Sequence, residues 1–165
     1  MTCAFTVMPS PVGDLKLVAG DAGLVAVLWP SDTAKRVRLG PLTHSPQHPL
    51  LIQADRELRE YFAGRRTAFT IPLDLVGTPF QRQMWQALQA IPFGETRSYA
   101  DLARQIGKPA ACRAVGAANG RNPLSIIVPC HRAIGSNGAL TGFAGGLDAK
   151  RYLLDHERKQ IRRAA

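Results

Sequence analysis

A short apolar stretch that runs into a proline and a cysteine constrains this sequence more than any other feature. Residues 126–128 are Ile-Ile-Val, and β-branched residues in a row favour a buried strand. Pro129 has no N–H for a sheet ladder, so we expect the strand to end there and to present Cys130. His131 and Arg132 make the surroundings of the thiol electropositive, which is typical of a reactive cysteine. A buried structural cysteine is the competing interpretation.

Charge is distributed unevenly along the chain. Residues 1–77 carry a net charge of +1 from eight basic and seven acidic side chains, whereas residues 78–165 carry +8 from thirteen and five. A strongly basic half predicts a polyanion partner, and nucleic acid is the commonest one. We therefore expect two domains, an N-terminal α/β domain over 1–77 and a basic domain over 78–165.

The first half of the chain has the patterns of a small sheet and one helix. We expect four strands, over residues 4–9, 14–19, 24–29 and 69–73. The proline-rich stretch 30–49 lacks periodicity and predicts a loop. Apolar residues then recur at helical spacing over residues 50–62, and Gly64 ends this helix.

The second half predicts helices that include a helix-turn-helix. Thr78–Gln81 begins a first helix with a capping box. A second helix over residues 98–107 and a third over 109–120 are joined by a tight turn, which is the helix-turn-helix arrangement. Asp148 begins the last helix, and residues 158–163 form a basic tail that is either disordered or in contact with phosphates.

Cysteine content and hydropathy limit the compartment. Three cysteines give no disulfide framework and favour a reducing environment, so we expect a cytoplasmic protein. We find no secretory signal and no apolar run long enough to span a membrane. Cys3, His44 and His48 match no zinc-ligand spacing, so we expect no metal site.

Short motifs in the second half resemble the O6-alkylguanine-DNA alkyltransferases, also called methylated-DNA–protein-cysteine methyltransferases. The motifs RAVG, NP, PCHR and GFAGG occupy residues 113–116, 122–123, 129–132 and 142–146. The resemblance extends from about residue 78 to 157, and over the first 77 residues only the order of elements matches. It implies an α+β fold: a small antiparallel sheet with a helix, ribonuclease H-like, and then a mostly helical domain with the helix-turn-helix and a short strand carrying the active cysteine.

The resemblance also implies an activity. The protein would repair double-stranded DNA that contains O6-alkylguanine by moving the alkyl group onto Cys130, once and irreversibly. The target base would be flipped out of the duplex, because chemistry on a base needs access to it. The protein would act as a monomer without a cofactor. Repair of O4-alkylthymine and cooperative binding along DNA stay open.

Catalytic roles carry over from the family residue by residue. His131 would take the proton of the Cys130 thiol through a bridging water, because adjacent side chains in extended backbone point apart. Glu157 would orient the imidazole and stabilise its charge. Asn122 would brace the turn that carries the cysteine. Tyr99 would donate to the flipped base and help to protonate the leaving guanine.

Binding roles carry over in the same way. Arg113 would fill the gap left by the flipped base. The net charge of +8 in the second half, and not the resemblance, predicts that Arg121 contacts phosphates. Small residues of the third predicted helix would let it lie close to the minor groove, although they suit tight helix packing equally well: Ala114, Ala117 and Ala118. The base would meet the glycine-rich loop at Phe143, Ala144 and Gly145.

Two departures from the family pattern and three competing functions stay open. Phe143 lies where many members have tyrosine, and Cys112 lies where alanine is common. A thiol hydrolase would also use Cys130 and His131, but it leaves the basic half unexplained. A transcription regulator explains the charge and not the cysteine, and a lesion-binding alkyltransferase-like protein would lack Cys130. The mass of the protein after incubation with O6-methylguanine DNA separates all four.

Overall fold

The computed structural model describes residues 2–164 of the chain. It divides into two compact units, Met1–Val76 and Gly77–Ala165, and each is described by itself below. Strands and helices are segregated along the chain in the α+β manner that the sequence predicted. Within the described residues, no helix is both long enough and apolar enough to cross a membrane.

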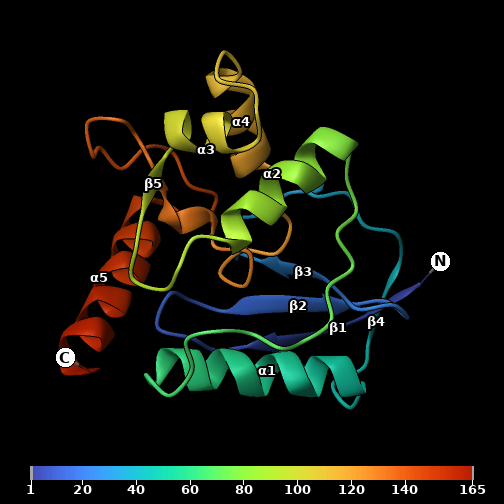
Figure 1. Cartoon of the computed structure of the whole chain (residues 1–165). Helices are drawn as coiled ribbons and strands as arrows, with labels where there is room; N and C mark the ends of the chain where they lie inside the picture. Colours follow the sequence, from blue (N-terminus) through green and yellow to red (C-terminus); the bar gives the residue numbers. More distant parts are fainter. Residues whose placement is uncertain (1, 165) are drawn as a thin grey trace. The chain divides into compact units, whose positions relative to one another are not determined.

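A four-stranded sheet with the order β3-β2-β1-β4 forms the base of the first unit (Figure 1). Its strands are β1 (Cys3–Met8), β2 (Leu15–Ala19), β3 (Leu24–Leu28) and β4 (Leu42–His44). The first three pair antiparallel, as expected, but β4 pairs with β1 in parallel. The expectation of an antiparallel sheet was therefore wrong, because the stretch 29–41 is long enough to cross over and return beside β1.

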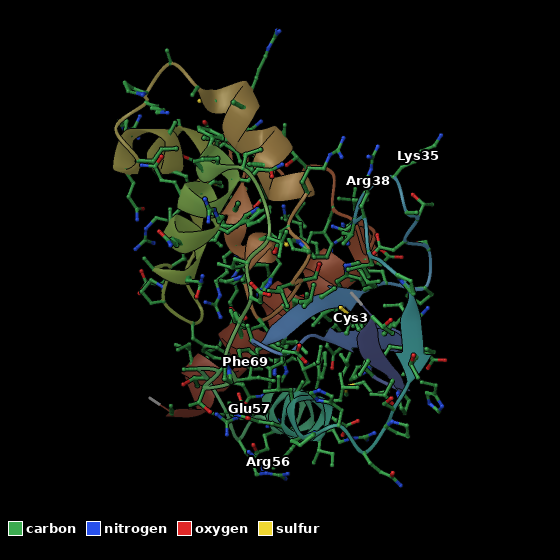
Figure 2. All side chains as sticks on the ribbon, turned by 90° about the vertical axis from the view of Figure 1, so that its right-hand side faces the viewer. Cys3, Lys35, Arg38, Arg56, Glu57 and Phe69 are labelled. Carbon is green, nitrogen blue, oxygen red and sulfur yellow. The ribbon has the colours of Figure 1, made fainter. Side chains whose placement is uncertain are left out.

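One helix, α1 (Pro49–Phe62), packs across a face of this sheet, as both views show (Figures 1 and 2). Its N-terminal cap is His48, whose Nδ1 accepts a hydrogen bond from the N–H of Leu50 at 3.2 Å. The helix buries Leu51, Ala54, Leu58 and Tyr61, each at the helical spacing that predicted it. Arg56 lies on the opposite side and points away from the sheet (Figure 2).

Glu57 is a fully buried carboxylate on α1 that holds the strand-like segment after it. Its Oε1 accepts from the N–H groups of Thr70 at 2.8 Å and Ile71 at 3.3 Å, and its Oε2 accepts from the hydroxyl of Thr70 at 2.7 Å and from Gln53 at 2.8 Å. Burial raises the pKa of Glu57, but these hydrogen bonds outweigh burial and leave the pKa below its ordinary value. Figure 2 shows Glu57 and Phe69 on the same side of α1.

These contacts explain why the strand expected over residues 69–73 was wrong. The N–H groups of Thr70 and Ile71 are taken by Glu57 and are not available to a sheet ladder. Only Leu73 forms an isolated bridge, with Leu24. The prediction that residues 30–49 are all loop was also wrong, because this stretch contains β4.

The second unit is mostly helical (Figure 1). Its helices are α2 (Pro79–Gln89), α3 (Tyr99–Gln105), α4 (Cys112–Gly120) and α5 (Leu147–Ala164). Two short strands, β5 (Arg97–Ser98) and β6 (Ala133–Ile134), pair in parallel, and a single turn of 3-10 helix, η1, spans Cys130–Arg132.

Local capping signals located the helix starts correctly in two cases. Thr78 and Gln81 form the capping box of α2, and Ser98 and Asp101 form that of α3. Gly107 joins α3 to α4 with φ at +76°, a conformation that glycine adopts without strain. The helix-turn-helix is therefore present, although α4 begins three residues later than the predicted start at residue 109.

The strand predicted over residues 126–128 was wrong, and so was the idea that a strand carries the cysteine. Ile126 has φ at +75°, which is a turn conformation, and Cys130 begins η1. The turn closes on itself through the N–H of Val128, which donates to the carbonyl of Leu124 at 2.8 Å. All three apolar side chains are buried, so burial alone accounts for the composition that favoured a strand.

Candidate active site

The thiol of Cys130 is buried at the start of η1 with only 3% of the residue exposed. The N–H of Cys130 donates to the carbonyl of Val128 at 2.8 Å, which fixes the backbone where the apolar turn meets η1. The two other cysteines, Cys3 and Cys112, are half-buried and exposed. Cys130 is thus the cysteine that the fold shields most completely among the three.

Asn122 fixes the turn that carries Cys130. Its Nδ2 donates to the carbonyl of Val128 at 2.8 Å, and its Oδ1 accepts from the N–H of Leu124 at 3.0 Å. Both ends of the turn are therefore tied to one fully buried amide. This is the bracing geometry that the sequence led us to expect of Asn122.

Glu157 connects the histidine and the arginine that follow the cysteine. Its Oε2 lies 2.7 Å from Nε2 of His131 and accepts from Nη2 of Arg132 at 3.0 Å, and its Oε1 accepts from Nε of Arg132 at 2.9 Å. The N–H of Gly94 donates to the same Oε1 at 3.1 Å. The carboxylate is 1% exposed, so one buried acid satisfies an imidazole, a guanidinium and a backbone amide.

The charges of this cluster set its protonation state. Burial has the largest effect on the pKa of His131 and lowers this pKa. The carboxylate of Glu157 raises the pKa of His131, and the cations of Arg132 and Lys150 lower it. The pKa of His131 is therefore below its ordinary value. Burial raises the pKa of Glu157, but His131 and Arg132 more than offset this and hold the pKa far below the usual range. Glu157 is therefore ionised and His131 is a neutral base at neutral pH.

The second ring nitrogen of His131 is available for proton transfer. Nδ1 of His131 is buried and has no hydrogen-bond partner among residues 2–164, whereas Nε2 is held by Glu157. A histidine that is oriented through one nitrogen and open at the other is the arrangement of a general base. His131 follows Cys130 directly in the chain, so the two residues are neighbours in η1.

A buried lysine, Lys150, also belongs to this cluster of charged groups. It is fully buried, and its Nζ donates to the carbonyl of Ala133 at 2.7 Å and lies 5.9 Å from the centre of the Phe143 ring. Burial lowers the pKa of Lys150, and interaction with the charge of Cys130 raises it in part. A cation coupled to Cys130 in this way favours the thiolate over the thiol.

The glycine-rich loop borders the site and is tied to α3. The hydroxyl of Tyr99 and Oγ1 of Thr141 lie 2.8 Å apart and share a hydrogen bond. The loop residues singled out from the sequence, Phe143, Ala144 and Gly145, are all half-buried. The phenol of Tyr99 is therefore fixed beside the loop that was expected to meet the base.

The outer face of α4 carries most of the residues predicted to meet DNA. Arg113, Ala114, Ala117 and Arg121 are exposed. Ala118 is 3% exposed, and its carbonyl accepts from Nε1 of Trp85 at 2.9 Å. The prediction that Ala118 contacts DNA was wrong, because that side of α4 packs against α2.

Two family models match this chain. One is described as 6-O-methylguanine DNA methyltransferase, ribonuclease-like domain, and matches residues 4–75. The other is described as 6-O-methylguanine DNA methyltransferase, DNA binding domain, and matches residues 79–159. The chain belongs to the 6-O-methylguanine DNA methyltransferase family.

Relatives of this family are similar over nearly the whole chain. A methylated-DNA–protein-cysteine methyltransferase of Mycobacterium leprae is 48% identical over 154 residues, 93% of this chain and 92% of the relative. The constitutive enzyme of that name from Bacillus subtilis is 46% identical over 157 residues, 93% of this chain and 94% of the relative. The crystal structure of Mycobacterium tuberculosis OGT in complex with DNA matches with a TM-score of 0.85 and 45% identity, covering 97% of this chain and 94% of that one.

Membership of the 6-O-methylguanine DNA methyltransferase family confirms the activity and the partner expected from the sequence. The protein binds DNA and repairs it by transferring an alkyl group to a cysteine. The family match also confirms the ribonuclease-like character of the N-terminal domain.

Sequence reasoning missed two residues of this methyltransferase site. Arg132 was treated only as part of an electropositive motif, yet it makes two of the four contacts to Glu157. Lys150 was not singled out at all, because a lysine in an amphipathic helix is usually exposed. A signal was present in its position on α5, seven residues before Glu157, which is two helical turns away on the same face.

Proposed function

We propose that Cys130 is the cysteine that accepts the alkyl group, with His131 as its base and Glu157 as the group that orients this base. The single observation that supports the assignment most strongly is the open Nδ1 of His131, the residue that follows the buried Cys130, on a ring whose Nε2 is held by Glu157 at 2.7 Å. Asn122 contributes by holding the turn that presents Cys130.

The proposed reaction is a displacement at the alkyl carbon. His131 takes the thiol proton through a bridging water, and the sulfur of Cys130 then forms a bond to the alkyl carbon while the bond from that carbon to O6 of guanine breaks. The electron pair of the broken bond stays on the guanine, which takes up a proton from the phenol of Tyr99. Because an alkyl thioether is not hydrolysed, the reaction ends with one alkyl group on one protein molecule. Neither a metal nor a cofactor takes part in these steps.

Lys150 supports the same reaction electrostatically. Its ammonium is buried, donates to the carbonyl of Ala133 and interacts with the charge of Cys130. Such a cation lowers the free energy of the thiolate relative to the thiol. We therefore include Lys150 among the groups that activate Cys130, together with His131.

The proposed DNA contacts lie on α4. Arg113 is exposed at the second residue of the helix and fills the gap in the duplex that a flipped base leaves. Ala114 and Ala117 are small and exposed, which lets the helix approach the minor groove closely, and Arg121 meets phosphates at its C-terminal end.

The proposed base-binding groups lie on the glycine-rich loop. The aromatic ring of Phe143 packs on the flipped base, but it lacks the hydroxyl that tyrosine would add. Ala144 and Gly145 meet the base through backbone groups, and the loop is held by the Tyr99–Thr141 hydrogen bond. The alkylation and DNA-binding steps are thus assigned to residues 78–165, with residues 1–77 as a separate N-terminal α/β domain. The three free cysteines and the DNA substrate favour the cytoplasm.

Peptide mass mapping tests the assignment. After reaction with an excess of duplex containing O6-methylguanine, we expect one methyl group per protein molecule, on the peptide that contains Cys130. Cys130→Ser should bind the same duplex and leave it methylated, because a hydroxyl is a much weaker nucleophile than a thiolate. Cys112→Ser is the matched control and should react as the wild type does. A label on Cys3 or Cys112, or more than one turnover per molecule, would overturn the proposal.

A further inference from the structure

The last two turns of α5 carry a cluster of cations that the repair reaction does not use. We refer to four of these residues together as the α5 basic patch: Arg158, Lys159, Arg162 and Arg163. All four are exposed, and within residues 2–164 none of them takes part in an ion pair. Asp155 is the one exposed acid in the last ten residues of the helix, because Glu157 is buried in the active site.

The spacing of the patch opposes helix formation. Residues 158 and 162 are four apart, as are 159 and 163, so each pair of like charges lies on neighbouring turns of one side of α5. Such pairs of like charge at this spacing destabilise a helix. The negative end of the helix dipole offsets part of this, but only for cations of the last turn. A patch that repels itself is stabilised when an anion binds to it.

The patch is nevertheless held in a fixed position by an apolar contact. Ile161 lies in the sequence between residues 158–159 and residues 162–163. It packs directly on Gly94, where an added Cβ would come within 2.5 Å of Cγ1 of Ile161. Gly94 also has φ at +82° and donates its N–H to Glu157. The basic end of α5 is therefore anchored to the same turn that supports the active site, and it does not depend on intrinsic helix propensity alone.

The patch lies at the end of the second unit that is opposite to the helix-turn-helix. In Figure 1 α4 is at the top of this unit and the C-terminal end of α5 at the bottom, and Figure 2 shows the same separation after a 90° turn about the vertical axis. α5 has 18 residues, which correspond to about 27 Å of helix. A straight duplex on the outer face of α4 therefore does not lie against the patch.

We propose that the α5 basic patch binds the phosphate backbone of a second segment of DNA while α4 is engaged with the first. Guanidinium groups suit this partner, because they form paired hydrogen bonds to phosphate oxygens and stay charged at every physiological pH. A protein with two phosphate-binding surfaces can pass directly from one segment of DNA to another without dissociating into solution. The patch would thus speed the search for a lesion rather than its repair.

The rate of release from a labelled, undamaged duplex measures direct transfer. The wild-type protein is bound to the labelled duplex and mixed with increasing concentrations of unlabelled duplex, and the release rate is followed by fluorescence anisotropy. If the patch binds a second segment, the release rate rises with competitor concentration, because the competitor engages the protein before the first duplex leaves. If the wild-type rate does not depend on competitor concentration, the proposal is wrong.

Charge-matched variants locate the effect. Arg162→Gln/Arg163→Gln removes two charges from the patch, and we expect the slope of release rate against competitor concentration to fall at least threefold. The control is Arg56→Gln/Arg65→Gln, which removes two exposed charges from the first unit and should keep the wild-type slope. Equal slopes for patch variant and wild type, or an equal loss in the control, would contradict the proposal.

A second patch variant guards against an effect on folding. Arg158→Gln/Lys159→Gln neutralises the other two cations and should lower the same slope. Both patch variants should react with free O6-benzylguanine at the wild-type rate, because that reaction needs a folded active site but no DNA. If the slope of release rate against competitor concentration fell only as much as the rate with O6-benzylguanine, the substitutions would have damaged the fold. That result would refute the assignment of the patch to DNA binding.

Discussion

Replacing Glu157 by glutamine removes one charge from the centre of the active site and keeps its shape. The change leaves the guanidinium of Arg132 buried, at 8% exposure of the side chain, without its carboxylate. Removing one partner of a buried ion pair costs about 3–5 kcal/mol. A domain has roughly 5–15 kcal/mol of stability in total, so we expect a folded but clearly weakened protein.

The effect of Glu157→Gln on the thiol follows from the same contacts. Thiolate formation transfers a proton to His131, and the carboxylate at 2.7 Å stabilises the resulting imidazolium. A hydrogen bond to a charged group contributes about 1.5–3 kcal/mol, and 1.36 kcal/mol corresponds to one pKa unit. The pH profile of alkylation should therefore shift to higher pH by about one to two units. The pKa of Glu157 lies far below its usual range, so the carboxylate is ionised throughout this profile.

The assay measures the rate of reaction with O6-benzylguanine between pH 5 and pH 9, together with urea unfolding at pH 7. Asp155→Asn is the matched control, because Asp155 is an exposed acid two residues earlier on the same helix. The control should match the wild type in both measurements. If folded Glu157→Gln kept the wild-type pH profile, Glu157 would be a structural residue and the proposed proton path through His131 would be wrong.

Three further predictions concern other groups. Arg113→Ala should slow repair of duplex DNA about tenfold or more, since base unstacking costs a few kcal/mol, and should leave the rate with free O6-benzylguanine unchanged; equal loss in both rates would assign Arg113 to chemistry or folding. Lys150→Met should move the pH profile of thiol alkylation upwards by about one unit, and a downward shift or none would remove Lys150 from thiol activation. Glu57→Gln should lower the free energy of unfolding by about 2 kcal/mol at pH 7 in urea titrations. The pKa of Glu57 is lowered on folding, so its stabilisation is present above its unfolded pKa and is lost as pH falls through the folded pKa; a difference between Glu57→Gln and wild type that grew on acidification would contradict this.

Elements with local signals were predictable from the sequence. The capping boxes at Thr78 and Ser98 involve residues only three positions apart. The sequence alone therefore shows both hydrogen-bond partners of each capping box. The apolar periodicity of α1 likewise follows from burial of one helix face. The role of Asn122 in the turn was expected from the family resemblance alone, and its hydrogen bonds to Val128 and Leu124 support that proposal.

Features that depend on particular hydrogen-bond or packing partners, which the apolar pattern does not specify, were not predictable. The turn at Ile126 and a strand would both bury β-branched residues, and what distinguishes them is the pair of hydrogen bonds from Asn122. The burial of Lys150 depends on the carbonyl of Ala133, 17 residues earlier in the chain. Similarly, Ala118 has the small side chain of a groove-facing residue, and only its packing beside Trp85 shows which side of α4 it occupies.

With Cys130 as the proposed alkyl acceptor, its burial at 3% exposure also limits unwanted reactions of the thiol before the protein meets a lesion. A thiol that reacts once cannot be regenerated by turnover. Each reaction with an oxidant or a free electrophile in the cell would therefore leave one protein molecule unable to repair DNA. Burial beneath the turn held by Asn122 restricts these encounters to reagents that enter the site. Burial of the thiol therefore determines how long the unreacted protein keeps its activity. A variant that exposed the thiol would lose activity during storage and under oxidative stress before its repair of fresh lesions changed.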